Sequence, residues 1–241
     1  MNPDSSILIM GANGGIGAAT ARLLQTRGHR LALAGRNRDA VQTLADELGA
    51  PAFTADATRE EDVAALFAAI GPVHGIVHAV GSMLLKPAHL TTIEDFRATL
   101  DTNLVSAFLM ARHGAKAMMG TGGSMVFFST VATGIGLANH EAIASAKAGI
   151  DGLVISAAAT YAAKNLRVNA VAPGLTDTPL ATRITGNEAA LKASIALHPL
   201  GRIGTPADIA AAAAWLVDPA TSWVTGQIIR VDGGLSTVRS R

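Results

Sequence analysis

A lysine, two hydroxyls and a histidine could perform acid–base chemistry near one helix of this chain. Ser129 and Thr130 end a short apolar run, and His140 lies seven positions before Lys147. Residues four and seven apart share a helix face, so His140, Ile143 and Lys147 would line up if a helix begins before His140. Histidine titrates near neutrality and can deliver a proton, whereas a hydroxyl can polarise a substrate oxygen. The spacing therefore predicts His140 as a proton donor on the helix face of Lys147.

Other interpretations of these residues stay open. Glu141 is a second, less well directed acid, and water is a third source of the proton. If the helix begins before His140, Asn139 resembles its N-cap; otherwise His140 is a surface residue in the preceding turn. His78 follows an apolar strand, where a lone histidine is interpreted as a structural residue rather than a catalytic one.

A glycine-rich turn lies near the start of the chain. The apolar run Ile7 to Met10 is followed by Gly11, Gly15 and Gly17 and then by a periodic, helix-like segment. Such glycines permit a sharp turn, let the backbone approach a pyrophosphate and let the helix pack on the sheet. The amides and the positive dipole end of the helix would face the phosphates. This turn therefore predicts a dinucleotide-binding site.

Arg36 stands where the second strand of that unit ends. An acid at this place accepts a hydrogen bond from a ribose 2′-hydroxyl, whereas an arginine suits a 2′-phosphate. Asp39 comes slightly late for the first role and is interpreted as a helix-start residue. The expected cofactor is therefore NADP, with NAD as the second choice.

The elements that would position these residues alternate between short β-type runs and longer alanine-rich helical patterns. The expected strands are Ile7–Met10, Leu31–Ala34, Ala52–Thr54, Gly75–Ala79, Met125–Phe128, Val168–Ala172 and Gln227–Val231. The expected helices are Ala18–Arg27, Asp39–Leu48, Glu60–Ile70, Ile93–Met119, Ala142–Ala163 and Pro206–Val217. The alternation predicts an α/β fold, a Rossmann-type doubly wound parallel sheet of about seven strands with helices on both faces.

Composition narrows the class of protein. The 241 residues are 49% hydrophobic and 15% charged, which predicts a single domain over residues 1–241. A net charge of +1 gives no electrostatic footprint for nucleic acid or for an anionic membrane, and Arg239 and Arg241 make only a small basic tail. The histidines lack metal-ligand spacing. Cysteine is absent, the first six residues lack a signal pattern, and the apolar run Ile209–Val217 is too short to span a membrane, so we expect a cytoplasmic protein.

Several motifs in order resemble the short-chain dehydrogenase/reductase family over nearly the whole chain. The motifs are Gly11-Ala-Asn-Gly-Gly-Ile-Gly17, Asp101-Thr-Asn-Leu104, Asn169 to Thr178, Gly201 to Pro206, and Val224 to Gly234. The sequence departs from the family pattern in two of the cofactor-side segments. Met10 replaces a threonine before the glycine motif, and His78-Ala-Val-Gly81 replaces the family's Asn-Asn-Ala-Gly.

The resemblance implies a set of site residues. Those implied to bind the cofactor are Gly11, Asn13, Gly15, Ile16, Gly17, Arg36, Asp56, Ala57, Ala79, Gly81, Lys147, Pro173, Gly174, Thr176 and Thr178. Those implied or inferred to be catalytic are Asn103, Thr130, His140 and Lys147. The family has a serine near Ser129 and Thr130, and the register of the resemblance favours Thr130 facing the site. The family's proton donor is a tyrosine four residues before the lysine, and this position holds Ile143, so the chain resembles an atypical member. A seven-residue interval is the Tyr-to-Lys interval of the divergent enoyl reductases of the same superfamily, which again indicates His140.

The function expected from this resemblance is hydride transfer between NADP(H) and a small carbonyl or alcohol substrate. An enone or enoyl-type reductase using His140, or a nucleotide-binding protein with little catalysis, are the alternatives. Leu180–Leu200 resembles the variable substrate loop of the family. Relatives commonly assemble through the helices that correspond to Ile93–Met119 and Ala142–Ala163, so we expect a homotetramer, with a dimer second.

Overall fold

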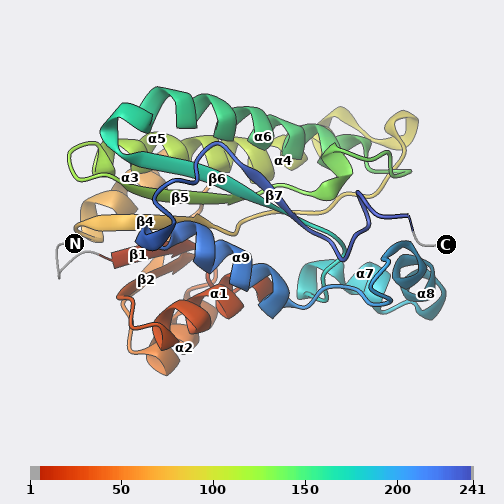
Figure 1. Ribbon diagram of the computed structural model, residues 1–241, viewed down its shortest axis with the longest axis horizontal. Helices are drawn as coiled ribbons and strands as arrows, with labels where there is room; N and C mark the ends of the chain where they lie inside the picture. Colours follow the sequence, from red (N-terminus) through yellow and green to blue (C-terminus); the bar gives the residue numbers. More distant parts are fainter. Residues whose placement is uncertain (1–5, 240–241) are drawn as a thin grey trace.

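A parallel sheet of seven strands forms the centre of the computed structural model, which describes residues 6–239 (Figure 1). The N-terminal segment 1–5 and Arg241, which enter the expectations about a signal peptide and a basic tail, lie outside the described residues. The strands are β1 (Ser6–Met10), β2 (Leu31–Gly35), β3 (Ala52–Thr54), β4 (Val73–His78), β5 (Gly123–Phe128), β6 (Leu166–Pro173) and β7 (Ile228–Val231). Their order in the sheet is β3-β2-β1-β4-β5-β6-β7. The predicted doubly wound parallel sheet is confirmed.

The strand order reverses beside β1. The chain passes from β1 to β2 and β3 on one side and then returns to pair β4 on the other side of β1. In open α/β sheets, ligands bind outside the carboxyl ends of the strands at such a reversal. The ends of β1 and β4, at Met10 and His78, therefore mark the place where a site is expected.

Helices cover both faces of the sheet (Figure 1). One layer holds α1 (Gly15–Thr26), α2 (Arg38–Leu48) and α9 (Pro206–Val217). The other holds α3 (Glu60–Ala69), α4 (Ile93–Leu100), α5 (Ser106–Met118) and α6 (Glu141–Tyr161). Ile7 and Ile9 belong to the core of the first layer and Leu8 and Met10 to that of the second, because successive strand side chains point to opposite faces.

The helix expected over Ile93–Met119 is interrupted. A π-helical turn at Asp101–Val105 separates α4 from α5, and the Ser106 amide bonds the carbonyl of Asp101, five residues earlier. The segment Leu180–Leu200, which resembles the family's substrate loop, contains two helices, α7 (Thr182–Thr185) and α8 (Glu188–Leu197). The helix α8 has Asn187 as its N-cap, whose side chain accepts from the Ala190 amide.

The lysine-bearing helix begins one residue before the expected Ala142, so the alternative in which it begins before His140 is not realised. The helix α6 begins at Glu141, and His140 is its N-cap residue without a side-chain cap. Asn139 has φ 64°, a left-handed conformation that a helix cannot continue, so Asn139 is not the N-cap. Strand β4 also ends one residue earlier than expected, at His78.

Within the described part of the chain, one helical stretch, Glu141–Lys164, is long and apolar enough to meet the length and composition test for a membrane span. In this structure 44% of its most apolar window is buried, and α6 packs on β6, α4 and α5.

Candidate functional site

The glycine turn after β1 forms a cradle that has no room for side chains. Gly11 has φ +83°, and a Cβ on Gly11 would lie 2.8 Å from the carbonyl carbon of Ala79. A Cβ on Gly17 would lie 2.2 Å from the carbonyl oxygen of Gly11, so only glycine lets the helix start so close to the turn. The helix α1 begins at Gly15 and directs its free amides towards this turn. The cradle therefore fits a pyrophosphate held by backbone amides.

Two charged residues follow the carboxyl ends of the neighbouring strands β2 and β3. Arg36 is 73% exposed and its Nη1 lies 3.8 Å from Oδ2 of Asp56. Burial of Asp56 opposes ionisation, but hydrogen bonds from Thr58 and the Arg36 guanidinium outweigh it and hold the pKa of the carboxyl below its ordinary value. Asn13 lies beside them, because its Oδ1 would be 2.8 Å from a Cβ on Gly35. The guanidinium is therefore largely exposed to solvent, and the lowered pKa keeps the Asp56 carboxylate ionised at neutral pH.

A cavity of about 530 Å³ extends from the glycine turn to α8. The residues of the expected site that line it are Gly15, Ile16, Ala79, Gly81, Thr130, His140, Lys147, Pro173, Gly174, Thr176 and Thr178. The others lie outside its wall, namely Gly11, Asn13, Gly17, Arg36, Asp56, Ala57 and Asn103. Ile143, the residue one turn before Lys147, also faces the cavity. The structure thus brings the glycine turn and the candidate catalytic groups into one space.

Lys147 is the buried cation of the cavity. The residue as a whole is 8% exposed, and its Nζ donates a hydrogen bond to the carbonyl oxygen of Phe128 at 2.8 Å. Burial lowers the pKa of the ammonium to about 8, against the opposing effect of the Asp151 carboxylate. The bond to Phe128 uses one of three Nζ protons, so the ammonium retains donors for a ligand.

Asn103 lies behind the cavity wall, in the π-helical turn. Its Nδ2 donates to Oγ of Ser82 at 3.0 Å and to the carbonyl of Thr99 at 2.9 Å, and its Oδ1 accepts from the Ser82 amide at 3.2 Å. A Cβ on Gly81 would lie 3.1 Å from that Oδ1 and 3.5 Å from Nζ of Lys147. Asn103 therefore shapes the wall beside Lys147 without entering the cavity.

The two hydroxyls at the end of β5, those of Ser129 and Thr130, differ in their hydrogen-bond partners. Thr130 Oγ1 accepts from the Ala132 amide at 3.3 Å, and its own hydrogen has no partner among the described residues. Ser129 is 4% exposed and its Oγ has no partner in the described part of the chain. Both residues line the cavity. A hydroxyl that already accepts from its backbone is oriented to donate to a substrate oxygen, which favours Thr130.

His140 and Glu141 differ in whether they line the cavity. His140 lines the cavity, and its Nδ1 is 2.8 Å from the carbonyl of Ala138, so Nδ1 carries a proton and Nε2 is left for the cavity. Glu141 is exposed, does not line the cavity, and accepts from the Ala88 amide at 3.4 Å. Of the two expected acids, only His140 faces the site.

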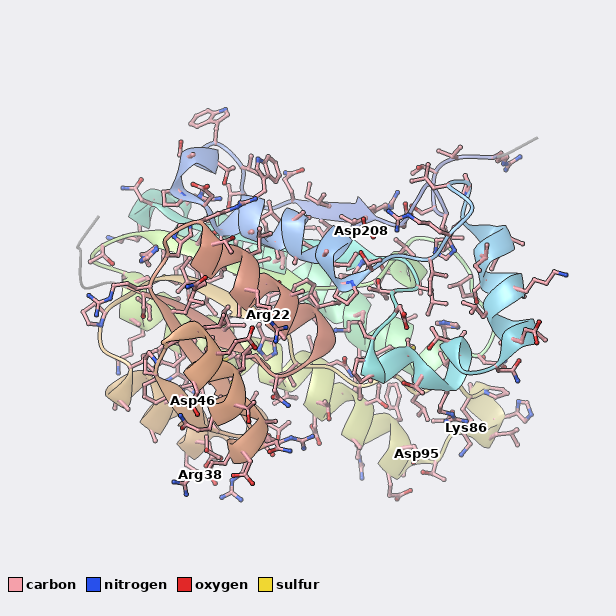
Figure 2. All side chains as sticks on the ribbon, turned by 90° about the horizontal axis from the view of Figure 1, so that it is seen from below. Arg22, Arg38, Asp46, Lys86, Asp95 and Asp208 are labelled. Carbon is pink, nitrogen blue, oxygen red and sulfur yellow. The ribbon has the colours of Figure 1, made fainter. Side chains whose placement is uncertain are left out.

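The loop that carries His140 is tied to the loop after β4. The Lys86 amide donates to the carbonyl of Asn139 at 2.8 Å. The Lys86 ammonium in turn contacts Oδ2 of Asp95 on α4 at 3.2 Å, and both side chains lie on the same edge of the molecule in Figure 2. These contacts hold the rim beside His140.

His198 was not singled out from the sequence, although it lines the cavity. It is 4% exposed, its Nδ1 lies 2.7 Å from the carbonyl of Ser194, and its Nε2 has no partner among the described residues. A Cβ on Gly174 would lie 2.8 Å from that Nε2. No local pattern announces this residue, because its surroundings come from segments distant in the chain.

The titratable groups that line the cavity are Lys147, His140 and His198, and no carboxylate lines it among residues 6–239. Such a lining stabilises negative charge that develops on a reacting oxygen. The remaining wall is largely apolar and includes Ile143 and Leu197. The site can therefore hold a small organic molecule and supply a proton to its oxygen.

Comparisons with known proteins agree with this geometry. The family model described as "Enoyl-(Acyl carrier protein) reductase" matches residues 11–236. The 2,5-dichloro-2,5-cyclohexadiene-1,4-diol dehydrogenase of Sphingobium indicum is 35% identical over 243 residues, 97% of each chain. The cis-4-hydroxycyclohexanecarboxylate dehydrogenase of Sinomonas cyclohexanicum is 37% identical over 242 residues, 96% of each chain. The solved structure of a short-chain type dehydrogenase/reductase from Mycobacterium ulcerans superposes with a TM-score of 0.93 at 32% identity and covers 98% of this chain and 91% of that one.

Proposed function

Because this chain belongs to the short-chain dehydrogenase/reductase family and is an NAD(P)-using oxidoreductase of small molecules, we propose that its cofactor is NADP(H) and its substrate a small carbonyl or alcohol. The observation that carries the proposal is one cavity, which joins the glycine turn at Gly15 to Thr130, His140 and Lys147. In this proposal Ile143 stands at the position of the family's tyrosine, so the active site is altered.

The residues present fit a nicotinamide dinucleotide. The amides around Gly11 and Gly15 would hold the pyrophosphate, Asp56 and Ala57 would border the adenine, and the segment Pro173–Thr178 would cover the nicotinamide. A Cβ on Gly15 would lie 2.9 Å from Cγ2 of Thr178, so this segment closes directly over the turn. When bound, the cofactor supplies or accepts the hydride.

Side chains of the cavity bind the substrate oxygen and supply the proton of the reaction. The Thr130 hydroxyl donates to the substrate oxygen, and the Lys147 ammonium stabilises the negative charge that develops there. His140 delivers the proton from Nε2 when its ring is protonated, since its Nδ1 proton is bound to Ala138. Ile143 has no proton to give and makes that part of the wall apolar.

The preference for NADP rests on Arg36. Its guanidinium is largely exposed and its contact with Asp56, at 3.8 Å, is loose. An exchange of this contact for a bidentate bond to a 2′-phosphate would be favourable. Gly14 provides no second basic group in the turn, so Arg36 acts nearly alone.

Two alternatives have support. An enone or enoyl-type reductase that uses His140 is favoured by the description of the matching family model and by the position of His140 in the cavity. A nucleotide-binding protein with little catalysis is favoured by Ile143. The names of the two relatives add cyclic alcohols, with or without a carboxylate, as substrates to test.

We further propose one domain over the whole chain, with a substrate loop near residues 180–200, in a cytoplasmic homotetramer, with a dimer second. Apolar side chains are exposed on two separate parts of the surface. Phe108 on α5 and Ile155 on α6 are 54% and 56% exposed, and Trp215 and Trp223 near the end of α9 are 45% and 98% exposed. Burial of both parts against copies of this chain would support a tetramer.

The test begins with fluorescence titration of NADPH and NADH, followed by NADPH oxidation against ketones and enones and NADP⁺ reduction by cyclic alcohols. His140→Ala should lower turnover by about 10² to 10⁴-fold and leave NADPH affinity nearly unchanged, because a general acid contributes about that factor. Glu141→Ala is the matched control, since its side chain lies outside the cavity, and it should retain the parent rate. Turnover of His140→Ala at the parent rate would show that this histidine is not the acid. Failure of the parent to bind either nucleotide would overturn the proposed function.

A further inference from the structure

A chain of two hydrogen bonds runs beneath the cavity wall, from the end of β4 to the π-helical turn. His78 is 1% exposed and does not line the cavity. Its Nε2 lies 3.0 Å from Oγ of Ser106, which lies 2.6 Å from the carbonyl oxygen of Thr102. A carbonyl only accepts, so the Ser106 hydrogen goes to Thr102, and Oγ must accept from His78. Nε2 therefore carries a proton, whereas the buried Nδ1 has no partner among the described residues. This arrangement fits a neutral imidazole protonated on Nε2.

This chain ends at a backbone group that the π-helical turn leaves without its usual helical partner. In an α-helix the Ser106 amide would bond Thr102, four residues earlier, but here it bonds Asp101, five residues earlier. The Ser106 hydroxyl replaces the missing bond to the Thr102 carbonyl. π-helical turns are rare and occur mostly as single turns inside α-helices, often at functional sites.

The turn carries Asn103, and Asn103 sets the position of the cavity wall. All of its described side-chain bonds go to Ser82 and Thr99, and Ser82 lines the cavity. The adjoining Gly81 lies so close that an added Cβ would approach both Asn103 and Lys147. A shift of the turn would therefore move the wall beside Lys147.

We propose that His78 is a positioning residue: through Ser106 and Thr102 it holds the π-helical turn that presents Asn103 to Ser82, and so sets the wall on which the nicotinamide cofactor lies. The last clause rests on the proposed function, whereas the positioning of the turn does not. Burial and the Lys147 ammonium lower the pKa of the ring and keep it uncharged, and the uncharged ring with its proton on Nε2 provides the donor of the chain.

A purely structural role is the competing explanation. The ring of His78 contacts Phe127 edge-on, with centroids 6.0 Å apart, so the imidazole also fills space in the core. Loss of stability alone cannot separate the two roles. The measurement must report on the turn and on the wall.

The variants are His78→Gln, His78→Leu and Ser106→Ala. Glutamine places an amide N–H near the position of Nε2 and keeps the donor, whereas leucine fills similar space without one. Ser124→Ala is the matched control: Ser124 is 1% exposed and its hydroxyl donates to the carbonyl of Leu216 at 2.9 Å, but it does not line the cavity.

The readouts are hydrogen exchange of the segments 79–83 and 101–106, NADPH affinity by fluorescence, and Tm. His78→Leu and Ser106→Ala should speed exchange in 101–106 and weaken NADPH binding, each by about tenfold, the factor expected from one lost buried hydrogen bond. His78→Gln should stay within about twofold of the parent in both. Ser124→Ala should lower Tm without changing either.

Two results would overturn the proposal. In one, His78→Leu and Ser106→Ala behave like Ser124→Ala, with a lower Tm but unchanged exchange and affinity. In the other, His78→Gln is as damaged as His78→Leu, which would show that the donor is not what matters. If the parent binds no NADPH, the proposed function fails, and the exchange data alone decide whether His78 holds the turn.

Discussion

Acidification should destabilise this protein through His78, well before its carboxylates are protonated. Burial, assisted by the Lys147 ammonium, lowers the pKa of the His78 imidazole to about 3. In the unfolded chain the pKa returns to about 6.5. At pH values between about 3 and 6.5, the His78 imidazole is protonated in the unfolded state but stays neutral in the folded state. The contribution of His78 to stability is therefore complete above about pH 6.5 and declines as the pH falls towards 3.

The size of the loss follows from the pKa of the unfolded chain. At about pH 5 the unfolded histidine is roughly 1.5 units below its pKa, so protonation favours unfolding by about 2 kcal/mol. This value holds as long as the folded pKa lies well below 5. For a protein whose total stability is about 5–15 kcal/mol, a loss of that size is readily measured.

The assay is urea unfolding of the parent and of His78→Gln at about pH 7.5 and pH 5, at one protomer concentration. Glutamine does not titrate, so the parent should lose about 2 kcal/mol more than the variant between the two pH values. Other groups with lowered pKa, such as His74, are present in both proteins and cancel in the difference. Equal losses in the two proteins would refute the assignment of His78 as a buried neutral donor.

Four further outcomes are expected. Arg36→Ala should reduce the preference for NADPH over NADH about tenfold, measured as a ratio of Kd values, and an unchanged ratio would remove Arg36 from cofactor choice. Ile143→Tyr should create or raise ketone reductase activity, and a variant no more active than the parent would contradict the altered-site interpretation. Gly17→Ala should destabilise the fold by about 1–3 kcal/mol in urea unfolding, because its Cβ would overlap the Gly11 carbonyl, whereas Gly120→Ala, with open space around it, should not. Phe108→Asp should reduce the mass in light scattering, and a parent of monomer mass at micromolar concentration would itself exclude the tetramer and the dimer.

The parallel α/β fold was predictable because its signals are local. Each strand is a short apolar run, each helix has its own period, and the glycine turn after Met10 joins the first strand to the first helix. The meeting of Thr130 and Lys147 in one cavity was expected from the resemblance to the family, because both residues stand at positions of its catalytic set. The fold is confirmed, and both residues line the cavity, while their roles stay proposals.

The features that escaped prediction depend on distant contacts. The π-helical turn depends on His78, which the sequence places more than twenty residues earlier, and nothing in Asp101–Val105 itself interrupts a helical period. The start of α6 depends on the left-handed Asn139, whose carbonyl is bound by the Lys86 amide. The position of His198 in the cavity depends on the packing of the end of α8 against Gly174, which is distant in the sequence. Local sequence patterns therefore predict the helices and strands well, but not the places where a contact with a distant residue interrupts a helix or sets its start.

The strand order also bears on how the chain reaches this structure. The central strand β1 is synthesised before the other strands, yet one of the two strands that pair with it is β4, with Ile7 opposite Gly75. Strand β6 likewise pairs with β7, which lies far along the chain, with Ala170 opposite Ile228. Such non-local parallel pairing must close long loops before any contact is gained, which slows folding. Until β4 arrives, the apolar edge of β1 is open to pairing with other chains. Refolding should therefore be slow and increasingly prone to aggregation as the protein concentration rises.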